Sequence, residues 1–89
     1  MKEGLIKMTP TFEEFQFTSF KFCRVYYDLC KGLPAEKQDK FLKNILAYVF
    51  ERKEPHFAKS DSEVETAFLI TKPILDKNMQ QVYKRAILR

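Results

Sequence analysis

The sequence contains no tryptophan, two glycines, two cysteines and a single histidine. Few glycines leave little material for tight turns, and no stretch alternates apolar and polar residues as a half-buried strand does, so an all-helical fold is expected. Two cysteines are too few to staple a secreted scaffold, which favours the reducing cytosol. No apolar run approaches the ~20 residues of a membrane span, and the first residues do not follow the pattern of a secretory leader. We therefore expect a cytoplasmic protein with no membrane partner.

The residues that usually carry catalysis or bind metals are sparse. His56 lies in a charged turn, where a lone histidine is normally solvated. Cys23 and Cys30 are seven positions apart on one predicted helix, roughly 10 Å, which is too far for a disulfide between them. A zinc site needs two further ligands, and His56 alone is at hand. Glycine-rich phosphate loops and nucleophile elbows are missing as well. We expect a non-enzymatic protein with two free thiols, no metal and no cofactor.

Apolar residues recur at helical spacing in three stretches of the 89-residue chain. These stretches predict three helices: one from Thr18 or Ser19 to Gly32, one from Ala35 to Glu51, and one from Asp61 or Ser62 to the end. Gly32 suits a left-handed C-terminal cap, and Pro34 suits the start of the second helix. The middle helix can pack on both neighbours. The predicted fold is therefore an all-α three-helix bundle.

Pro73 lies inside the last predicted helix. A proline in a helix interior removes one hydrogen bond and clashes with the preceding turn, so we expect a kink near 67–73, or two helices meeting there. The second half, from Ile74 to Leu88, is long for so small a domain and is predicted to project from it. The projecting end carries Ile87 and Leu88, two apolar residues that a partner could cover.

Residues 1–16 read as an N-terminal arm, and residues 17–89 as a single helical domain. Thr11 and Glu14 are spaced as a capping box, which places Phe12 and Phe15 on one face of a short turn. Such an arm either folds back on its own core or packs on a neighbouring subunit. We favour the first alternative.

The net charge of +4 is concentrated in the last helix. Up to Thr71 the chain has eleven basic and eleven acidic side chains, whereas from Lys72 to Arg89 it has five basic residues and one aspartate. Cations near a helix C-terminus oppose the macrodipole, and this explanation competes with a nucleic-acid contact. The charge therefore leaves the partner open.

Four short segments resemble a small helical domain of unknown function found in phage and prophage proteins of Gram-positive bacteria. The matching pieces are Ser19-Phe20 with Tyr26, Leu33-Pro34-Ala35-Glu36, the run Tyr48 to Pro55, and the run Phe68 to Asn78. The resemblance covers 17–83. It implies a phage or mobile-element origin and an accessory role in the host cytosol, sometimes beside replication proteins. It implies no activity and no catalytic residues.

We expect a helical protein–protein interaction module that inhibits or recruits a host or replication protein. Aromatic residues make up 15% of the chain. An unusually aromatic core is the first explanation, and the excess also favours a homodimer or a docking face that buries some of the rings. The predicted partner-binding residues are Lys72, Asp76, Asn78, Gln81, Tyr83, Lys84 and Arg85. Asp76 and Asn78 are poor interior-helix residues, so either a partner contact or local hydrogen bonds must compensate for them. The alternative is a nucleic-acid-binding accessory factor that uses the basic last helix.

Overall fold

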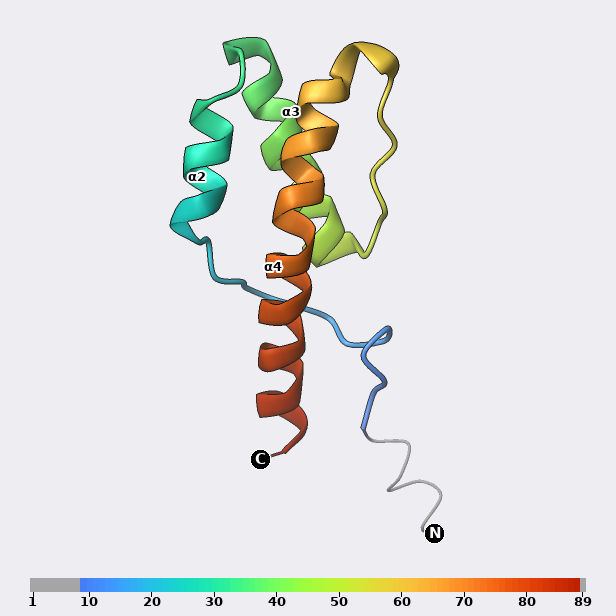
Figure 1. Cartoon of the computed structure of the whole chain (residues 1–89). Helices are drawn as coiled ribbons and strands as arrows, with labels where there is room; N and C mark the ends of the chain where they lie inside the picture. The colour runs from blue at the N-terminus through green and yellow to red at the C-terminus, as the bar shows by residue number, and fades with distance from the viewer. Residues whose placement is uncertain (1–8, 89) are drawn as a thin grey trace, which may run out of the picture.

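The computed structural model describes residues 9–88, and this part of the chain forms three helices and no strand (Figure 1). Its elements are α2 (Arg24–Lys31), α3 (Ala35–Leu46), the π-helical turn η1 (Ala47–Glu51), the 3-10 turn η2 (Lys59–Asp61) and α4 (Ser62–Ile87). α3 and α2 both pack against α4, whose C-terminal half extends beyond the other two helices. The predicted all-α three-helix arrangement with a long last helix is confirmed.

The start of the first helix was predicted wrongly. α2 begins at Arg24, and Cys23 before it is extended, with φ −77° and ψ 151°. Figure 1 shows the preceding segment crossing α4 as extended chain. In this conformation Phe20 packs on Phe50 of η1, with 5.6 Å between ring centroids, while Phe22 packs on Tyr26 of α2 at 5.5 Å. Contacts with two separate elements therefore outweigh the local helical pattern.

Gly32 ends α2 in a right-handed conformation, with φ −77° and ψ −9°, so the predicted left-handed cap is also wrong. Its N–H bonds to the carbonyls of Asp28 and Leu29, both at 3.2 Å. The left-handed position lies instead at Arg52, with φ 58°, directly after η1. There the Lys53 N–H reaches back to the Ala47 carbonyl at 3.2 Å and closes the widened last turn.

α4 runs through Pro73 as one continuous helix, which rules out two helices meeting there. Proline has no N–H to donate to the carbonyl four residues earlier, at Leu69. The Leu69 side chain is 58% exposed on this face of α4. Water can therefore serve that carbonyl, and the helix continues.

The core is built from all three helices and η1, together with the extended segment before α2 and the turn after that helix. Its buried apolar residues are Phe17, Tyr26, Cys30, Leu33, Phe41, Ile45, Val49, Val64, Ala67, Phe68, Leu75 and Met79. Phe57, in the turn between η1 and η2, packs on Phe68 with 6.0 Å between the ring centroids. Two aromatic side chains, Phe22 and Tyr27, are about half exposed. Most of the aromatic surplus is thus used inside the domain.

The described part of the arm, residues 9–16, folds back on its own core, as we favoured. The Thr11 N–H bonds to Glu14 Oε1 at 3.1 Å and the Glu14 N–H to Thr11 Oγ1 at 3.3 Å, as predicted for a capping box. Phe12 and Phe15 both pack edge-on against Tyr83 of α4, at 5.4 and 5.5 Å. Residues 1–8 of the predicted arm lie outside the described residues.

Candidate partner-binding groove

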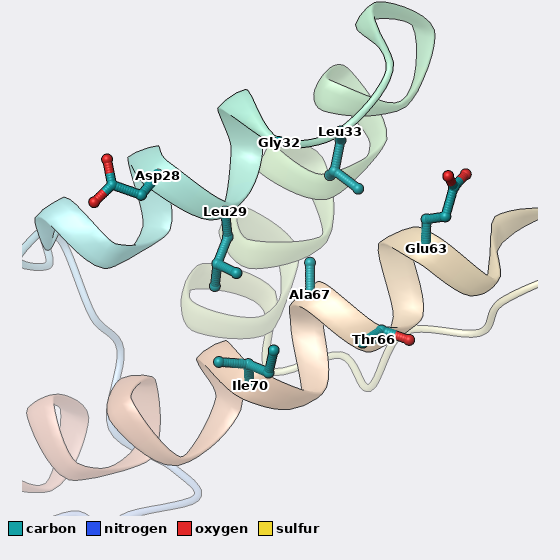
Figure 2. Close-up of a pocket in the computed structure, with 8 residues that line it drawn as sticks. All are labelled: Asp28, Leu29, Gly32, Leu33, Glu63, Thr66, Ala67 and Ile70. Carbon is teal, nitrogen blue, oxygen red and sulfur yellow. The ribbon is translucent and has the colours of Figure 1, made fainter.

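An apolar groove of about 390 Å³ runs between α2 and α4 (Figure 2). It is lined by Asp28, Leu29, Gly32, Leu33, Glu63, Thr66, Ala67 and Ile70. The first four belong to α2 and the turn after it, and the last four to the first half of α4. The groove is thus formed by two segments far apart in the sequence.

The floor of the groove is buried, and one of its walls is open to solvent. Leu33 and Ala67 are 9% and 5% exposed, whereas Ile70 is 50% exposed. Gly32 adds no side chain to the opposite wall. α2 is eight residues long, and α4 is twenty-six. A helix this short cannot cover the apolar face of its longer neighbour, so Leu69 and Ile70 remain accessible.

Two carboxylates, Asp28 on α2 and Glu63 on α4, line the groove beside its apolar residues. Asp28 lies 3.6 Å from Arg24, four positions earlier on α2, and Glu63 lies 3.9 Å from Lys37. Both carboxylate side chains are more than half exposed, so each pair contributes little to stability. The groove residues include no lysine, arginine or histidine in the described part of the chain. The lining residues are therefore apolar apart from Thr66 and two carboxylates, and each carboxylate has a cation beside it, Arg24 or Lys37.

The structure separates the predicted partner-binding residues onto different faces of α4. Lys72 and Asp76 face η1 and the turn after it: Lys72 lies 3.4 Å from Glu54, and Asp76 accepts a hydrogen bond from the Tyr48 hydroxyl. Burial of the Tyr48 hydroxyl, together with the adjacent Asp76 carboxylate, raises the tyrosine pKa well above its ordinary value. The hydrogen bond from Tyr48, a contact within the chain, thus compensates for the low helix propensity of Asp76.

On another face of α4, hydrogen bonds within the chain also compensate for the low helix propensity of Asn78. Its side-chain amide donates to Cys23 Sγ at 3.3 Å and to the Tyr26 hydroxyl at 3.4 Å. Burial of Tyr26 raises its pKa to about 12, and the contact with Cys23 adds to the shift while Asn78 opposes it. Gln81 and Arg85 lie nearby and line a shallow pocket of about 160 Å³ together with Lys21, Asn78 and Val82.

Tyr83 is one of the predicted partner-binding residues, but in the structure its side chain makes contacts within the chain. Its hydroxyl donates to the Pro10 carbonyl at 2.8 Å, and its ring holds the two arm phenylalanines. Lys84 and Arg85 are exposed in the last turn of α4. Of the seven predicted residues, these two, with Gln81, are the exposed ones.

The groove itself was missed by the sequence reasoning. A signal was available, because Leu69 and Ile70 are apolar but fall outside the buried stripe of Val64, Ala67 and Phe68 on the same helix. Two adjacent large apolar residues off the core stripe of a surface helix are a mark of a second contact surface.

Other chemistry offers less. The part of the chain that the structure describes contains no group of three His, Cys, Asp or Glu side chains placed to hold a metal ion. His56 borders a pocket of about 250 Å³ with Lys40, Lys43 and Asn44 among its lining residues. Cys23 and Cys30 are free thiols, as predicted. Across residues 9–88, no helix combines the length and the apolar character needed to cross a membrane.

The fold and the groove define a small three-helix all-α domain with one open apolar face between α2 and α4. Residues 19–87 match the family of unknown function DUF6291, which spans well over half of the chain. The protein belongs to this family. The expected resemblance to a domain of unknown function, placed at 17–83 from the sequence, is confirmed at that level. Comparison with curated proteins and with solved structures gives no match.

Proposed function

We propose that this protein is a non-enzymatic interaction module that holds an apolar segment of a partner protein in the groove between α2 and α4. The observation that carries the proposal is the groove, a mostly apolar hollow of about 390 Å³ that remains open after the chain has packed its own rings. Removing apolar surface from water contributes roughly 25 cal/mol per Å² to association. Ile70, half exposed at the open wall, is the most exposed of the apolar residues that line the groove.

The shape and charge of the groove favour one mode of binding. Two helix surfaces bound it, as in grooves that receive the apolar face of an amphipathic helix. Asp28 and Glu63 add negative charge beside the apolar floor. A partner helix with apolar residues on one face and lysine or arginine beside them fits both properties.

The biological setting of the proposal comes from the sequence resemblance. It is an accessory protein of phage or mobile-element origin, acting in the cytosol of a Gram-positive host, that inhibits or recruits a host or replication protein. The groove supports the interaction part of this role, since a partner helix of the kind described above can dock there.

Photo-cross-linking tests the groove directly. A photoreactive amino acid replaces Ile70 in the full chain, and a matched control carries the same group at Lys53, an exposed residue in the turn after η1. A protein cross-linked from position 70 and not from position 53 supports the proposal. Position 70 giving no more product than position 53 contradicts it.

A blocking variant provides a second test. Gly32 lies in the groove wall with φ −77°, a backbone conformation that any residue adopts, and a Cβ there meets the Leu29 carbonyl at an ordinary 3.5 Å. Gly32→Leu should therefore fold and partly fill the groove, and the cross-link from position 70 should fall at least about tenfold. Gly32→Ala is the matched control and should retain the cross-link.

A second candidate function is nucleic-acid binding through the shallow pocket at the end of α4. Lys21 and Arg85 line this pocket, no carboxylate does so among the described residues, and neither cation takes part in an ion pair there. A mobility-shift assay over a salt series tests it. Binding that weakens steeply with salt, and further in K21A/R85A but not in K53A, supports this function. Equal binding by K21A/R85A and wild type contradicts it.

A further inference from the structure

We propose that the partner held in the α2–α4 groove is a second copy of this chain, whose α4 C-terminal end enters the groove while its own groove receives the first copy's end. This inference rests on the proposed function of the groove and names the occupant. It is carried by complementarity between two surfaces of the same molecule, in charge and in apolar character.

The last turn of α4 carries exposed cations, which are missing from the described residues that line the groove. Lys84 and Arg85 are exposed cations, and neither takes part in an ion pair within residues 9–88. Ile87 and Leu88, beside them, are 36% and 79% exposed. The end of α4 is thus basic and apolar, whereas the groove is lined by apolar residues and by two carboxylates, each more than half exposed, whose pairs with Arg24 and Lys37 can be exchanged for other cations.

A chain cannot place this end in its own groove. α4 is continuous, and Leu88 follows Ile70 by eighteen residues, which is five helical turns or about 27 Å along the axis. Figure 1 shows the C-terminal end of α4 pointing away from the end of the bundle that holds the groove. The end that satisfies the groove must therefore come from another molecule.

An antiparallel arrangement of two α4 helices makes the exchange reciprocal. When the partner's Lys84 lies level with Ile70, the same symmetry sets the partner's Ile70 level with Lys84. The contact is then the same on both copies and closes as a twofold dimer instead of growing into a filament. It also places the cations at each helix C-terminus beside the groove that holds Asp28, and about 9–11 Å along the axis from Glu63 in the acidic first turn of the other α4.

A charge-exchange experiment on the full chain tests this arrangement. One variant, K84E/R85E, has an acidic end and an acidic groove, and the other, D28K/E63K, has a basic end and a basic groove. Each variant alone repels itself, so its dimer dissociation constant should rise at least about tenfold over wild type. In an equimolar mixture each end meets a groove of opposite charge, and a mixed dimer should form. Sedimentation analysis over a concentration series measures both effects.

The apolar part of the contact is tested by Leu88→Asp, which should weaken dimerisation as strongly. Leu46→Asp is the matched control, since Leu46 is an exposed leucine on α3 outside the groove residues. Circular dichroism establishes that every variant compared is folded. Equal weakening by the two leucine variants overturns the assignment of the end of α4 to the groove.

Other outcomes also decide the inference. A wild-type chain that stays monomeric at every concentration, or a variant mixture that gives no mixed dimer, overturns it. If position 70 then cross-links a different protein, the groove function stands with another occupant. If position 70 cross-links nothing, both proposals fail.

Discussion

The side-chain amide of Asn78 on α4 donates a hydrogen bond to the hydroxyl of Tyr26 on α2, at 3.4 Å, across fifty-two positions of sequence. The same amide reaches Cys23 Sγ at 3.3 Å, just before α2 begins. Tyr26 is fully buried. One side chain thus ties α2 to α4, and it does so between the two helices that form the groove.

Replacing Asn78 by alanine should lower the free energy of unfolding by about 1–3 kcal/mol, because it leaves the buried Tyr26 hydroxyl without this donor. In a Y26F background the same replacement should cost less, since no hydroxyl remains to be satisfied. Urea unfolding of the four proteins in this cycle measures the coupling. Gln80→Ala, an exposed position on the same helix, should have little effect. Equal costs of N78A in both backgrounds would show that the hydrogen bond contributes nothing.

Arg52 should act as the latch of the N-terminal arm. Its guanidinium donates to the Phe12 carbonyl at 2.9 Å and lies 4.5 Å from the Phe12 ring centroid. Arg52→Lys keeps the charge but loses the planar fork, so stability should fall by about 1–2 kcal/mol. Limited digestion with chymotrypsin should also cut faster at Phe12 and Phe15.

The matched control for the latch is Lys53→Arg, an exposed cation one position further on that is paired with Glu51 at 3.4 Å. It should leave both stability and digestion unchanged. Unaltered cleavage at Phe12 in R52K would mean that the ring contacts alone hold the arm.

Local sequence signals predicted local structure well. The Thr11–Glu14 capping box and the start of α3 after Pro34 each depend on residues within four positions of one another. The start of α2 was missed because Phe20 contacts Phe50, thirty positions away, and this contact keeps the chain extended. At this position the tertiary contact, and not the weak helix propensity of the segment, determined where the helix begins.

The groove could not be read from the sequence, since it exists only where α2 ends short of the face it packs on. No single segment carries its pattern: Gly32 and Leu33 follow one helix, while Ala67 and Ile70 lie on another. The residues of the predicted partner-binding site on α4 do not form one surface, because the sequence alone does not show which neighbour each of them faces. Residues such as Asp76 and Tyr83 share a helix, but they face different neighbours, Tyr48 and Pro10.

Two tyrosines should titrate late in alkaline solution. Burial raises the pKa of Tyr26 to about 12, and burial with the Asp76 contact raises that of Tyr48 further. Because the pKa of each tyrosine is higher in the folded than in the unfolded state, the neutral hydroxyl contributes to the stability of the fold. This contribution is complete below the unfolded pKa of about 10 and is lost as pH rises through the folded pKa values. Spectrophotometric titration of wild type, Y26F and Y48F should show one late-titrating group fewer in each variant. Identical titrations in all three proteins would exclude the assignment.

Protonation of Asp61 should account for part of the loss of folding stability in acid. The hydrogen bond from Lys40, at 3.2 Å, and then that from Lys37, at 3.3 Å, hold the pKa of this carboxyl below its usual value. A lowered folded-state pKa contributes stability that is present above the unfolded value of about 3.9 and is lost as pH falls through the folded value. Asp61→Asn should therefore be less stable than wild type at neutral pH, and this difference should shrink in acid.

Thermal melts over a pH series measure the effect. Glu51→Gln removes an exposed carboxylate of a surface pair and is the matched control, with a small, pH-insensitive change. A difference between D61N and wild type that stays constant from neutral pH to strong acid would exclude titration of Asp61 as the cause.

Pro73→Ala should stabilise the protein. Alanine restores the N–H that can bond to the Leu69 carbonyl and removes the clash with the preceding turn, worth ~3 kcal/mol in an unrelieved helix interior. The proline also restricts the unfolded chain, which offsets about 1 kcal/mol of this gain. The expected increase is about 1–2 kcal/mol, or roughly 5–10 °C in Tm for a domain of this size. Pro55→Ala, in the turn between η1 and η2, is the control and should not raise Tm. A Tm of P73A equal to or below that of wild type would mean that α4 is shaped around the proline, and that the course of its basic end depends on it.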